Sequence, residues 1–257
     1  MKFNGRNVYI SRETNLGQNV RIGDNAVIYD NVEIGDGSTL CNDVVLGEPV
    51  NSYYHDPSYE NPVTVIGPDS LVRSHSIIYA GCRIGAGFSC GHRVTIRENC
   101  IIGEHCSIGT LCDIQGNVRM GKYCRLHSNV HISQKSSLAD FVFLYPFSVM
   151  TNDPYPPSLD TRGGRIGNYT QIGVHAIILA GVRVGENCLV AANSVVTKTV
   201  PDFSLVKGDP ARVAMDIRKY VVMGKGKPYP WMYRYDRGMP WQGIGFDTWI
   251  QQENSKK

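Results

Sequence analysis

Asp113 and His131, two side chains that can move a proton together, are 18 residues apart in this sequence. A carboxylate can hold an imidazole in one tautomer, and the imidazole can then take a proton from a reacting group. Glu98 offers a second proton acceptor, and Arg97 beside it offers a guanidinium that can stabilise a developing oxyanion. These residue types predict acid–base chemistry, provided that the fold brings positions 18 residues apart into contact.

A six-residue repeat supplies the elements that must position these residues. An aliphatic residue or Met occupies every sixth position in three runs, 10–46, 66–150 and 166–196, with Cys90 as the one exception. A period of six matches neither an α-helix nor the simple alternation of an ordinary strand. It predicts short strands joined by tight corners, three to each triangular turn, so that residues 18 apart stack on one face. The repeats predict about nine such turns.

Glycine follows the aliphatic position in many repeats, and we expect it to allow the backbone conformation of a sharp corner. The glycines concerned are Gly23, Gly35, Gly67, Gly85, Gly103, Gly109, Gly121, Gly167, Gly173 and Gly185. Six cysteines stand four residues after an aliphatic position, where a small inward side chain is expected; they are Cys82, Cys100, Cys106, Cys112, Cys124 and Cys188. We interpret them as small, reduced core residues. The sequence contains no CxxC pair of the kind that would indicate a zinc site.

Two polar segments, 51–61 and 151–165, interrupt the repeat and are rich in tyrosine and proline. Long loops in a compact protein are often functional. Counting by 18 predicts that both loops leave the repeat at the same corner. That corner carries Tyr79, Arg97, Gln115, Ser133 and Thr151, with Ala80, Glu98, Gly116, Gln134 and Asn152 beside them. The pattern predicts a site where the two loops converge, although a merely solvated corner would also be polar.

Two motifs, TNDPYPPS at 151–158 and GDPAR at 208–212, accompany the end of the repeat. With the hexapeptide pattern over 8–200, they make the chain resemble the left-handed β-helix N-acetyltransferases that modify amino groups of nucleotide-linked sugars. The resemblance implies a left-handed parallel β-helix, a homotrimer, and acyl-CoA, by default acetyl-CoA, bound between neighbouring subunits. The acceptor would be a dTDP- or UDP-linked amino-deoxy sugar. The expected substrate-binding residues are Arg97, Gln115, Gln134, Asn152, Asp153 and Tyr155.

The resemblance also implies where acyl-CoA binds. Its pantetheine arm would run along Gly173, Ala180 and Ala192. Its phosphates would meet Lys198, Lys207 and Arg212, although each of these cations could equally be an ordinary surface charge. The sugar amine would attack the thioester directly. His131 oriented by Asp113, or else Glu98, would accept the proton, unless the leaving thiolate accepts it, as in some relatives.

The composition changes after Ala214, which divides the chain into a β-helix domain, 1–214, and a C-terminal segment, 215–257. We expect one short helix with Ile217, Tyr220 and Val221 on one face. An extended arm would follow and pack on this β-helix or on a neighbour's, because it contains all three tryptophans, Trp231, Trp241 and Trp249.

The net charge of +3 is too small to indicate nucleic-acid binding, although a mildly basic surface suits phosphate-bearing ligands. The chain has no apolar stretch of membrane-spanning length and no signal peptide pattern, so we expect a cytoplasmic protein without membrane contact. We expect no metal. One alternative is a zinc hydratase resembling the γ-type carbonic anhydrases, through His92, His127 and His131, whose spacing fits imperfectly. A non-catalytic β-helix scaffold and an O-acetyltransferase are the others.

Overall fold

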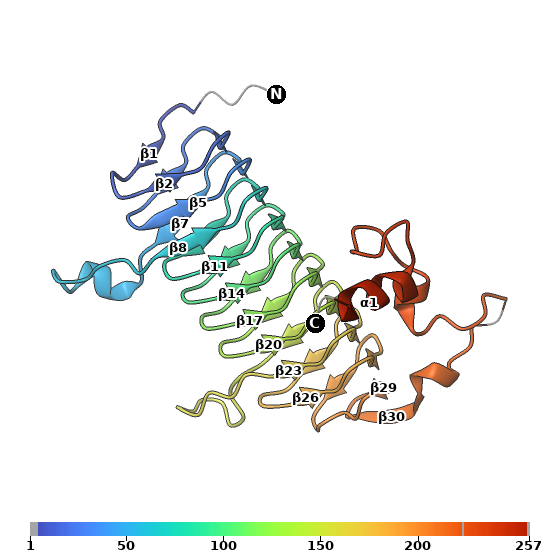
Figure 1. The fold of residues 1–257 in the computed structure, drawn as a ribbon. Helices are drawn as coiled ribbons and strands as arrows, with labels where there is room; N and C mark the ends of the chain where they lie inside the picture. The colour runs from blue at the N-terminus through green and yellow to red at the C-terminus, as the bar shows by residue number, and fades with distance from the viewer. Residues whose placement is uncertain (1–4, 223, 256–257) are drawn as a thin grey trace.

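The computed structural model describes residues 5–222 and 224–255, and in it the repeat forms an all-β parallel β-helix (Figure 1). Three sheets, here called A, B and C, form the sides of a triangular prism and contain 10, 9 and 11 strands. The parallel β-helix and its hexapeptide repeats are therefore confirmed. It has slightly more turns than the nine predicted, because two further strands extend sheet C beyond the last hexapeptide.

The strands are short and follow one another around the prism in the order A, B, C. Sheet A contains β1 (Tyr9–Ile10), β4 (Val27–Ile28), β7 (Val45–Glu48), β10 (Ile77–Tyr79), β13 (Thr95–Ile96), β16 (Asp113–Ile114), β19 (His131–Ile132), β22 (Val149–Met150), β25 (Ile177–Ile178) and β28 (Val195–Val196). Sheet B contains β2 (Asn15–Leu16), β5 (Val32–Ile34), β8 (Thr64–Ile66), β11 (Arg83–Ile84), β14 (Ile101–Ile102), β17 (Arg119–Met120), β20 (Ser137–Leu138), β23 (Arg165–Ile166) and β26 (Arg183–Val184). Sheet C contains β3 (Arg21–Ile22), β6 (Thr39–Leu40), β9 (Leu71–Val72), β12 (Ser89–Cys90), β15 (Ser107–Ile108), β18 (Arg125–Leu126), β21 (Phe143–Leu144), β24 (Gln171–Ile172), β27 (Leu189–Val190), β29 (Ser204–Gly208) and β30 (Ala211–Asp216).

The aliphatic positions of the repeat fill the interior of the prism. Ile96 pairs in register with Ile114, and Ile114 with Ile132, so residues 18 apart do stack, and all three are fully buried. The six cysteines are buried as predicted, and the Cys112 thiol lies 3.0 Å from the carbonyl oxygen of His127 on the next turn. Burial raises the pKa of Cys112 to about 11, so this thiol stays protonated at neutral pH.

The glycines after the aliphatic positions serve another purpose than the one expected. The left-handed backbone conformation falls two residues later, at residues such as Asn25 and Asn187, whose φ angles are 58° and 52°. The repeat glycines instead allow successive turns to approach closely. A Cβ atom on Gly67 would lie 2.5 Å from the backbone carbon of Gly85, a distance that no real side chain tolerates.

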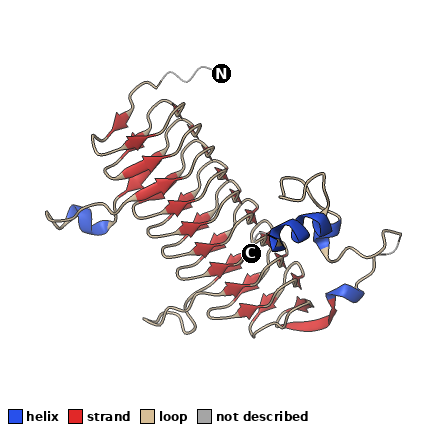
Figure 2. Ribbon diagram, viewed as in Figure 1, coloured by secondary structure: helices blue, strands red, loops and turns tan. Residues whose placement is uncertain are grey.

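The segment after β30 folds against the β-helix of its own chain. The predicted short helix is only a 3-10 turn, η2 (Ile217–Lys219), because β30 extends through Asp216. The arm is not wholly extended: it forms a second 3-10 turn, η3 (Trp231–Tyr233), and an α-helix, α1 (Phe246–Asn254), both drawn in blue in Figure 2. All three tryptophans are buried in a second core with Phe141 and Phe143 of the β-helix. Whether 215–257 is a separate domain stays a prediction.

Candidate functional site

Both loops project from the edge between sheets A and B, as predicted (Figure 1). The first connects β7 to β8 and contains the 3-10 turn η1 (Asn51–Tyr54), and the second connects β22 to β23. They do not converge, however. Four strands of sheet A separate β7 from β22, which places the loop bases roughly 24 Å apart along the prism. The loops therefore flank a polar edge instead of meeting above one point.

His131 and Asp113 face each other on adjacent strands of sheet A, in the middle of this region. The Nδ1 atom of His131 lies 3.0 Å from Oδ2 of Asp113, and Gln115 donates a hydrogen bond of 2.7 Å to the same oxygen. Both side chains of the pair are partly exposed, at 39% and 42%. An ionised carboxylate only accepts hydrogen bonds, so this contact assigns the proton of a neutral imidazole to Nδ1 and leaves Nε2 as the acceptor.

The hydrogen bond from His131 is the main cause that lowers the pKa of Asp113, against the opposing effect of partial burial. A carboxylate with a lowered pKa keeps its charge well below neutral pH. The pair therefore persists at neutral pH and is lost only when the pH falls through the lowered pKa of Asp113.

The second expected proton acceptor, Glu98, is already engaged. The Nε atom of Arg97 donates a hydrogen bond of 2.8 Å to Oε2 of Glu98, and the guanidinium lies over the ring of Tyr79 at 4.7 Å. This ion pair engages one oxygen of Glu98 and leaves the Arg97 guanidinium less available to an oxyanion. Of the two expected bases, His131 is favoured, because its Nε2 is left as the acceptor, whereas Oε2 of Glu98 is already ion-paired.

Asp153 organises the loop that follows β22. Its carboxylate accepts hydrogen bonds from the backbone amides of Tyr155 and Ser158, at 2.9 and 2.8 Å, and from the Ser158 hydroxyl at 2.6 Å. The hydrogen bond from Ser158 is the largest of the effects that lower the pKa of Asp153. Tyr155 projects into solvent with 74% of its surface exposed, and the carbonyl of Asn152 accepts a hydrogen bond from the amide of Arg162. Sequence reasoning missed this structural use of Asp153, although Ser158 five residues later was a possible signal.

The expected acyl-CoA residues fall on different edges, and two expected substrate-binding residues, Gln134 and Asn152, share one of these edges. Gln134, Asn152, Ala180 and Lys198 follow β19, β22, β25 and β28, so they line up along the edge that carries His131. Gly173 and Ala192 follow β24 and β27 of sheet C, at the edge between sheets C and A. Lys207 and Arg212 pair in register across the antiparallel hairpin of β29 and β30. In a single chain these residues therefore lie in three places: the edge between sheets A and B, the edge between sheets C and A, and the hairpin.

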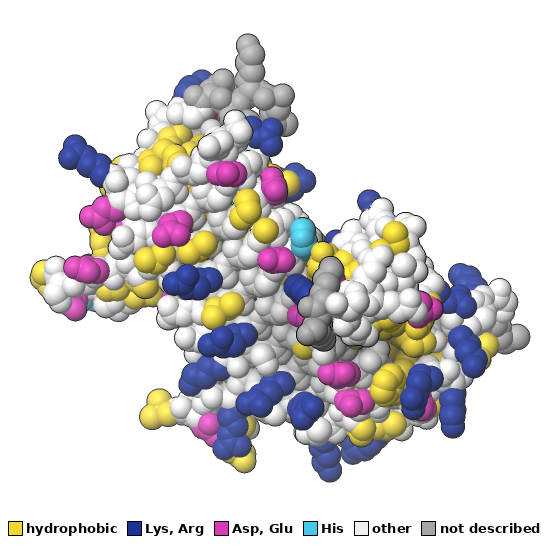
Figure 3. Space-filling model, viewed as in Figure 1, with side chains coloured by type: hydrophobic (Ala, Val, Ile, Leu, Met, Phe, Trp, Pro, Cys, Tyr) yellow, Lys and Arg dark blue, Asp and Glu magenta, His cyan; other side chains and the backbone are white. Residues whose placement is uncertain are grey.

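Basic side chains gather over the later strands of sheet B (Figure 3). Arg83, Arg119, Arg165 and Arg183 occupy the outward, exposed positions of β11, β17, β23 and β26. No ion pair among the described residues involves them. Their field attracts anions to the side of the molecule next to the polar edge.

The three histidines of the zinc alternative are spread over two sheets: His92 and His127 follow strands of sheet C, and His131 lies in sheet A. Within residues 5–222 and 224–255, no three His, Cys, Asp or Glu side chains are grouped closely enough to hold a metal ion. In the same residues, no helix has the length and apolar character that a bilayer crossing requires.

Comparisons with known proteins agree on the repeat. The model of the family described as bacterial transferase hexapeptide (six repeats) matches residues 13–48, 99–134 and 163–198. A chloramphenicol acetyltransferase of Morganella morganii is 29% identical over 101 residues, which are 36% of this chain and 48% of that protein. The chain spans about half the length of the curated relatives it matches.

Two solved structures have similar repeats. A variant of perosamine N-acetyltransferase from Caulobacter crescentus, in complex with CoA and GDP-perosamine, is 22% identical with a TM-score of 0.40, over 57% of each chain. A UDP-N-acetylglucosamine acyltransferase from Campylobacter jejuni is 21% identical with a TM-score of 0.39, over 84% of this chain and 77% of that one.

Proposed function

We propose, from the premise that the repeats of this chain belong to the hexapeptide-repeat transferase family, that the protein is an acyl-CoA-dependent N-acyltransferase. Its acceptor would be the amino group of a dTDP- or UDP-linked amino-deoxy sugar, and acetyl-CoA the default donor. The observation that carries the proposal is the His131–Asp113 pair, whose free Nε2 lies on an edge flanked by the TNDPYPPS loop. The acetyltransferase relative supports the acyl donor.

The pair suits this reaction because an amine must lose a proton as it attacks a carbonyl. Nε2 of His131 takes a proton from the attacking amine while the new C–N bond forms at the thioester carbon. The C–S bond then breaks, the amide is released, and the imidazolium returns the proton to the leaving thiolate. Asp113 remains ionised throughout and stabilises the positive ring, which is the role its lowered pKa permits.

The separation of the acyl-CoA residues supports a site between subunits of a homotrimer. Ala180 and Lys198 share the edge of His131, whereas Lys207 and Arg212 project from the hairpin of sheet C. A coenzyme bound between neighbouring chains would meet one group on each chain. In this arrangement the arginines of sheet B would draw anionic substrates toward the groove.

A thiol-release assay tests the proposal. The protein is incubated with acetyl-CoA and a panel of UDP- and dTDP-linked 3-amino and 4-amino sugars, and free CoA is followed with a thiol reagent. Release that depends on one sugar is the expected result, with N-acetylation of that sugar confirmed by mass spectrometry. Absence of release with every sugar, together with absence of acetyl-CoA binding by calorimetry, would overturn the proposal.

A further inference from the structure

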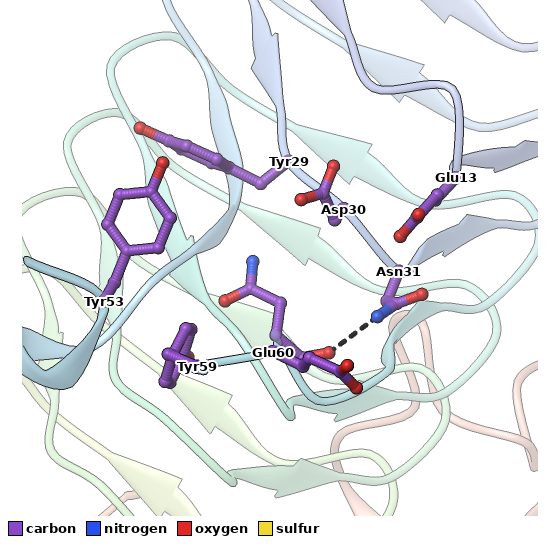
Figure 4. Close-up of a pocket in the computed structure, with 8 residues that line it drawn as sticks. Glu13, Tyr29, Asp30, Asn31, Tyr53, Tyr59 and Glu60 are labelled. Carbon is purple, nitrogen blue, oxygen red and sulfur yellow. Dashed lines mark hydrogen bonds between the residues drawn. The ribbon is translucent and has the colours of Figure 1, made fainter. Parts of the chain in front are cut away.

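The first loop encloses a cavity of about 510 Å³ against the first turns of the β-helix (Figure 4). Tyr29 lies directly after β4, and Asp113 and His131 lie on β16 and β19, so four to five strand spacings, roughly 19–24 Å, separate Tyr29 from the His131–Asp113 pair. The volume of the cavity is in the range of sites for small molecules. The cavity is therefore a separate feature of the molecule with its own chemistry.

Three carboxylates line this cavity, and none of the other lining residues that the structure describes is a cation. Glu13, Asp30 and Glu60 approach it from the first turns and from the loop (Figure 4). None of them takes part in an ion pair among the described residues, and Asp30 has only a hydroxyl partner, Ser11. No lysine, arginine or histidine within 5–222 and 224–255 belongs to the lining, so its charge complements a positively charged ligand.

Three tyrosines, Tyr29, Tyr53 and Tyr59, form the aromatic part of the lining. The rings of Tyr53 and Tyr59 meet edge to face with their centroids 6.0 Å apart. Burial is the main cause that raises the pKa of Tyr29, so its phenol stays neutral and adds no further charge. Aromatic faces beside carboxylates favour an organic cation, because such a ligand has both positive charge and carbon surface.

Asn61 supplies an independent sign that a hydrogen-bond donor is missing. It lines the cavity and is 9% exposed; its Nδ2 donates to the carbonyl of Gly47 at 2.8 Å, which fixes the orientation of the amide. Its backbone carbonyl accepts from Asn31, the dashed line in Figure 4. Its Oδ1 atom has no hydrogen-bond partner in the described part of the chain, and neither has the buried hydroxyl of Tyr59. Buried polar atoms are normally paired, so these two oxygens call for a donor from outside the chain.

We propose that this cavity binds a small aliphatic amine in its ammonium form, with one or more ammonium groups and no acidic group. The ammonium hydrogens supply donors for the carboxylates and for Asn61, and the methylene groups pack on the tyrosines. A metal ion fits less well, because the described carboxylates form no group of three close enough to share one ion. The proposal is independent of acyl transfer.

Calorimetric titration with 1,4-diaminobutane tests the proposal, with 1,4-butanediol as the uncharged probe of the same length and CaCl₂ as the metal probe. The expected result is saturable binding of one diamine per chain and no saturable binding of the diol or of calcium. Equal binding of the diol, saturable binding of calcium alone, or no saturable binding of the diamine would overturn the proposal.

Variants separate binding from folding. Glu13→Gln combined with Glu60→Gln should weaken diamine binding at least tenfold. The matched pair Glu33→Gln with Glu104→Gln removes the same charge elsewhere and should leave binding unchanged. Tyr59→Phe should weaken binding severalfold while the unliganded protein keeps its thermal midpoint, because it deletes only an unpartnered hydroxyl. If both double variants weakened diamine binding equally, the binding would reflect the net charge of the protein and not this cavity, and the proposal would be overturned.

Discussion

Two edges of the prism are built from the same repeat but differ in character: one is aromatic and covered, and the other is polar and exposed. At the edge between sheets B and C, the left-handed corner positions carry a ladder of His105, Tyr123, Phe141 and Tyr169. Successive rings stack with centroids 4.8, 5.3 and 4.9 Å apart, and the C-terminal segment packs on the rings from Tyr123 to Tyr169, whereas His105 stays exposed. At the edge between sheets A and B, the equivalent positions include Asn99, Asn117 and Lys135, and polar side chains stay uncovered.

The comparison teaches that the repeat determines the backbone, whereas the corner residue of each hexapeptide determines whether an edge is covered or exposed. A left-handed conformation is unfavourable for an aromatic residue, whereas asparagine tolerates it. At the edge between sheets B and C the penalty is offset by burial, and burial also raises the pKa of Tyr169 to about 12. At the edge between sheets A and B the corner residues Asn99, Asn117 and Lys135 are exposed, so no burial offsets the penalty there. This edge therefore stays accessible to ligands.

The largest expected effect concerns activity at the polar edge. His131→Asn should lower kcat for the proposed acyl transfer by about 10²–10⁴-fold and flatten the acidic side of the pH–rate profile, because the proton acceptor is lost. The matched control is His75→Asn, which removes another histidine near an aspartate, 3.9 Å from Asp43 at the edge between sheets C and A. Wild-type kcat and pH profile in the His131 variant would exclude it as the base.

The next effect concerns stability at the covered edge. Trp241 is 1% exposed and its ring lies 5.2 Å from those of Phe141 and Trp249. Trp241→Ala should lower the free energy of unfolding in urea by about 3–5 kcal/mol through the cavity it creates. A loss below about 1 kcal/mol would show that the C-terminal segment contributes little, and the contrast between the two edges would then fail.

A smaller and more local effect is expected in the second loop. Asp153→Ala removes the acceptor that organises the loop, so trypsin should cleave after Arg162 several times faster while the β-helix keeps its thermal midpoint. Asp56→Ala removes a similar acceptor, bonded to Ser58, from the first loop and should not change cleavage at Arg162. An unchanged rate in the Asp153 variant would assign its carboxylate to substrate binding instead of loop structure.

The smallest effect tests the rule of the corner position itself. Leu111 has a φ of 61° and is 49% exposed, so Leu111→Asn should raise the free energy of unfolding by about 0.5 kcal/mol. Phe141→Asn at the covered edge should instead lower it by several kcal/mol, since the stacked ring is lost. Calorimetric melting of both variants gives the comparison, and changes of the same sign would contradict it.

Much of the fold was predictable, because stacking every 18 residues follows from the period of the aliphatic positions. The contact between His131 and Asp113 was predictable for the same reason. The engagement of Glu98 by Arg97 was not, because it depends on rotamers that no spacing determines. Predicting the distance between the loops required counting the turns that separate them, in addition to the corner at which each loop leaves the repeat. Helix α1 was not predicted from the sequence. It packs on the aromatic ladder of the β-helix, and the repeat alone does not show that this ladder needs a cover.

The loops also bear on how this chain can fold and change. Most strand pairs join residues 18 apart, but Val45 pairs with Ile77 and Val149 with Ile177, so the chain closes longer segments at only two levels of the prism. Lengthening a closed segment from 18 to 32 residues costs about 0.5 kcal/mol in chain entropy. Assembly can therefore spread from turn to turn past both insertions with little delay. Because this cost is low, both junctions can accept inserted sequence. Acceptor preference could therefore diversify there without disturbing the strand pairing of the β-helix.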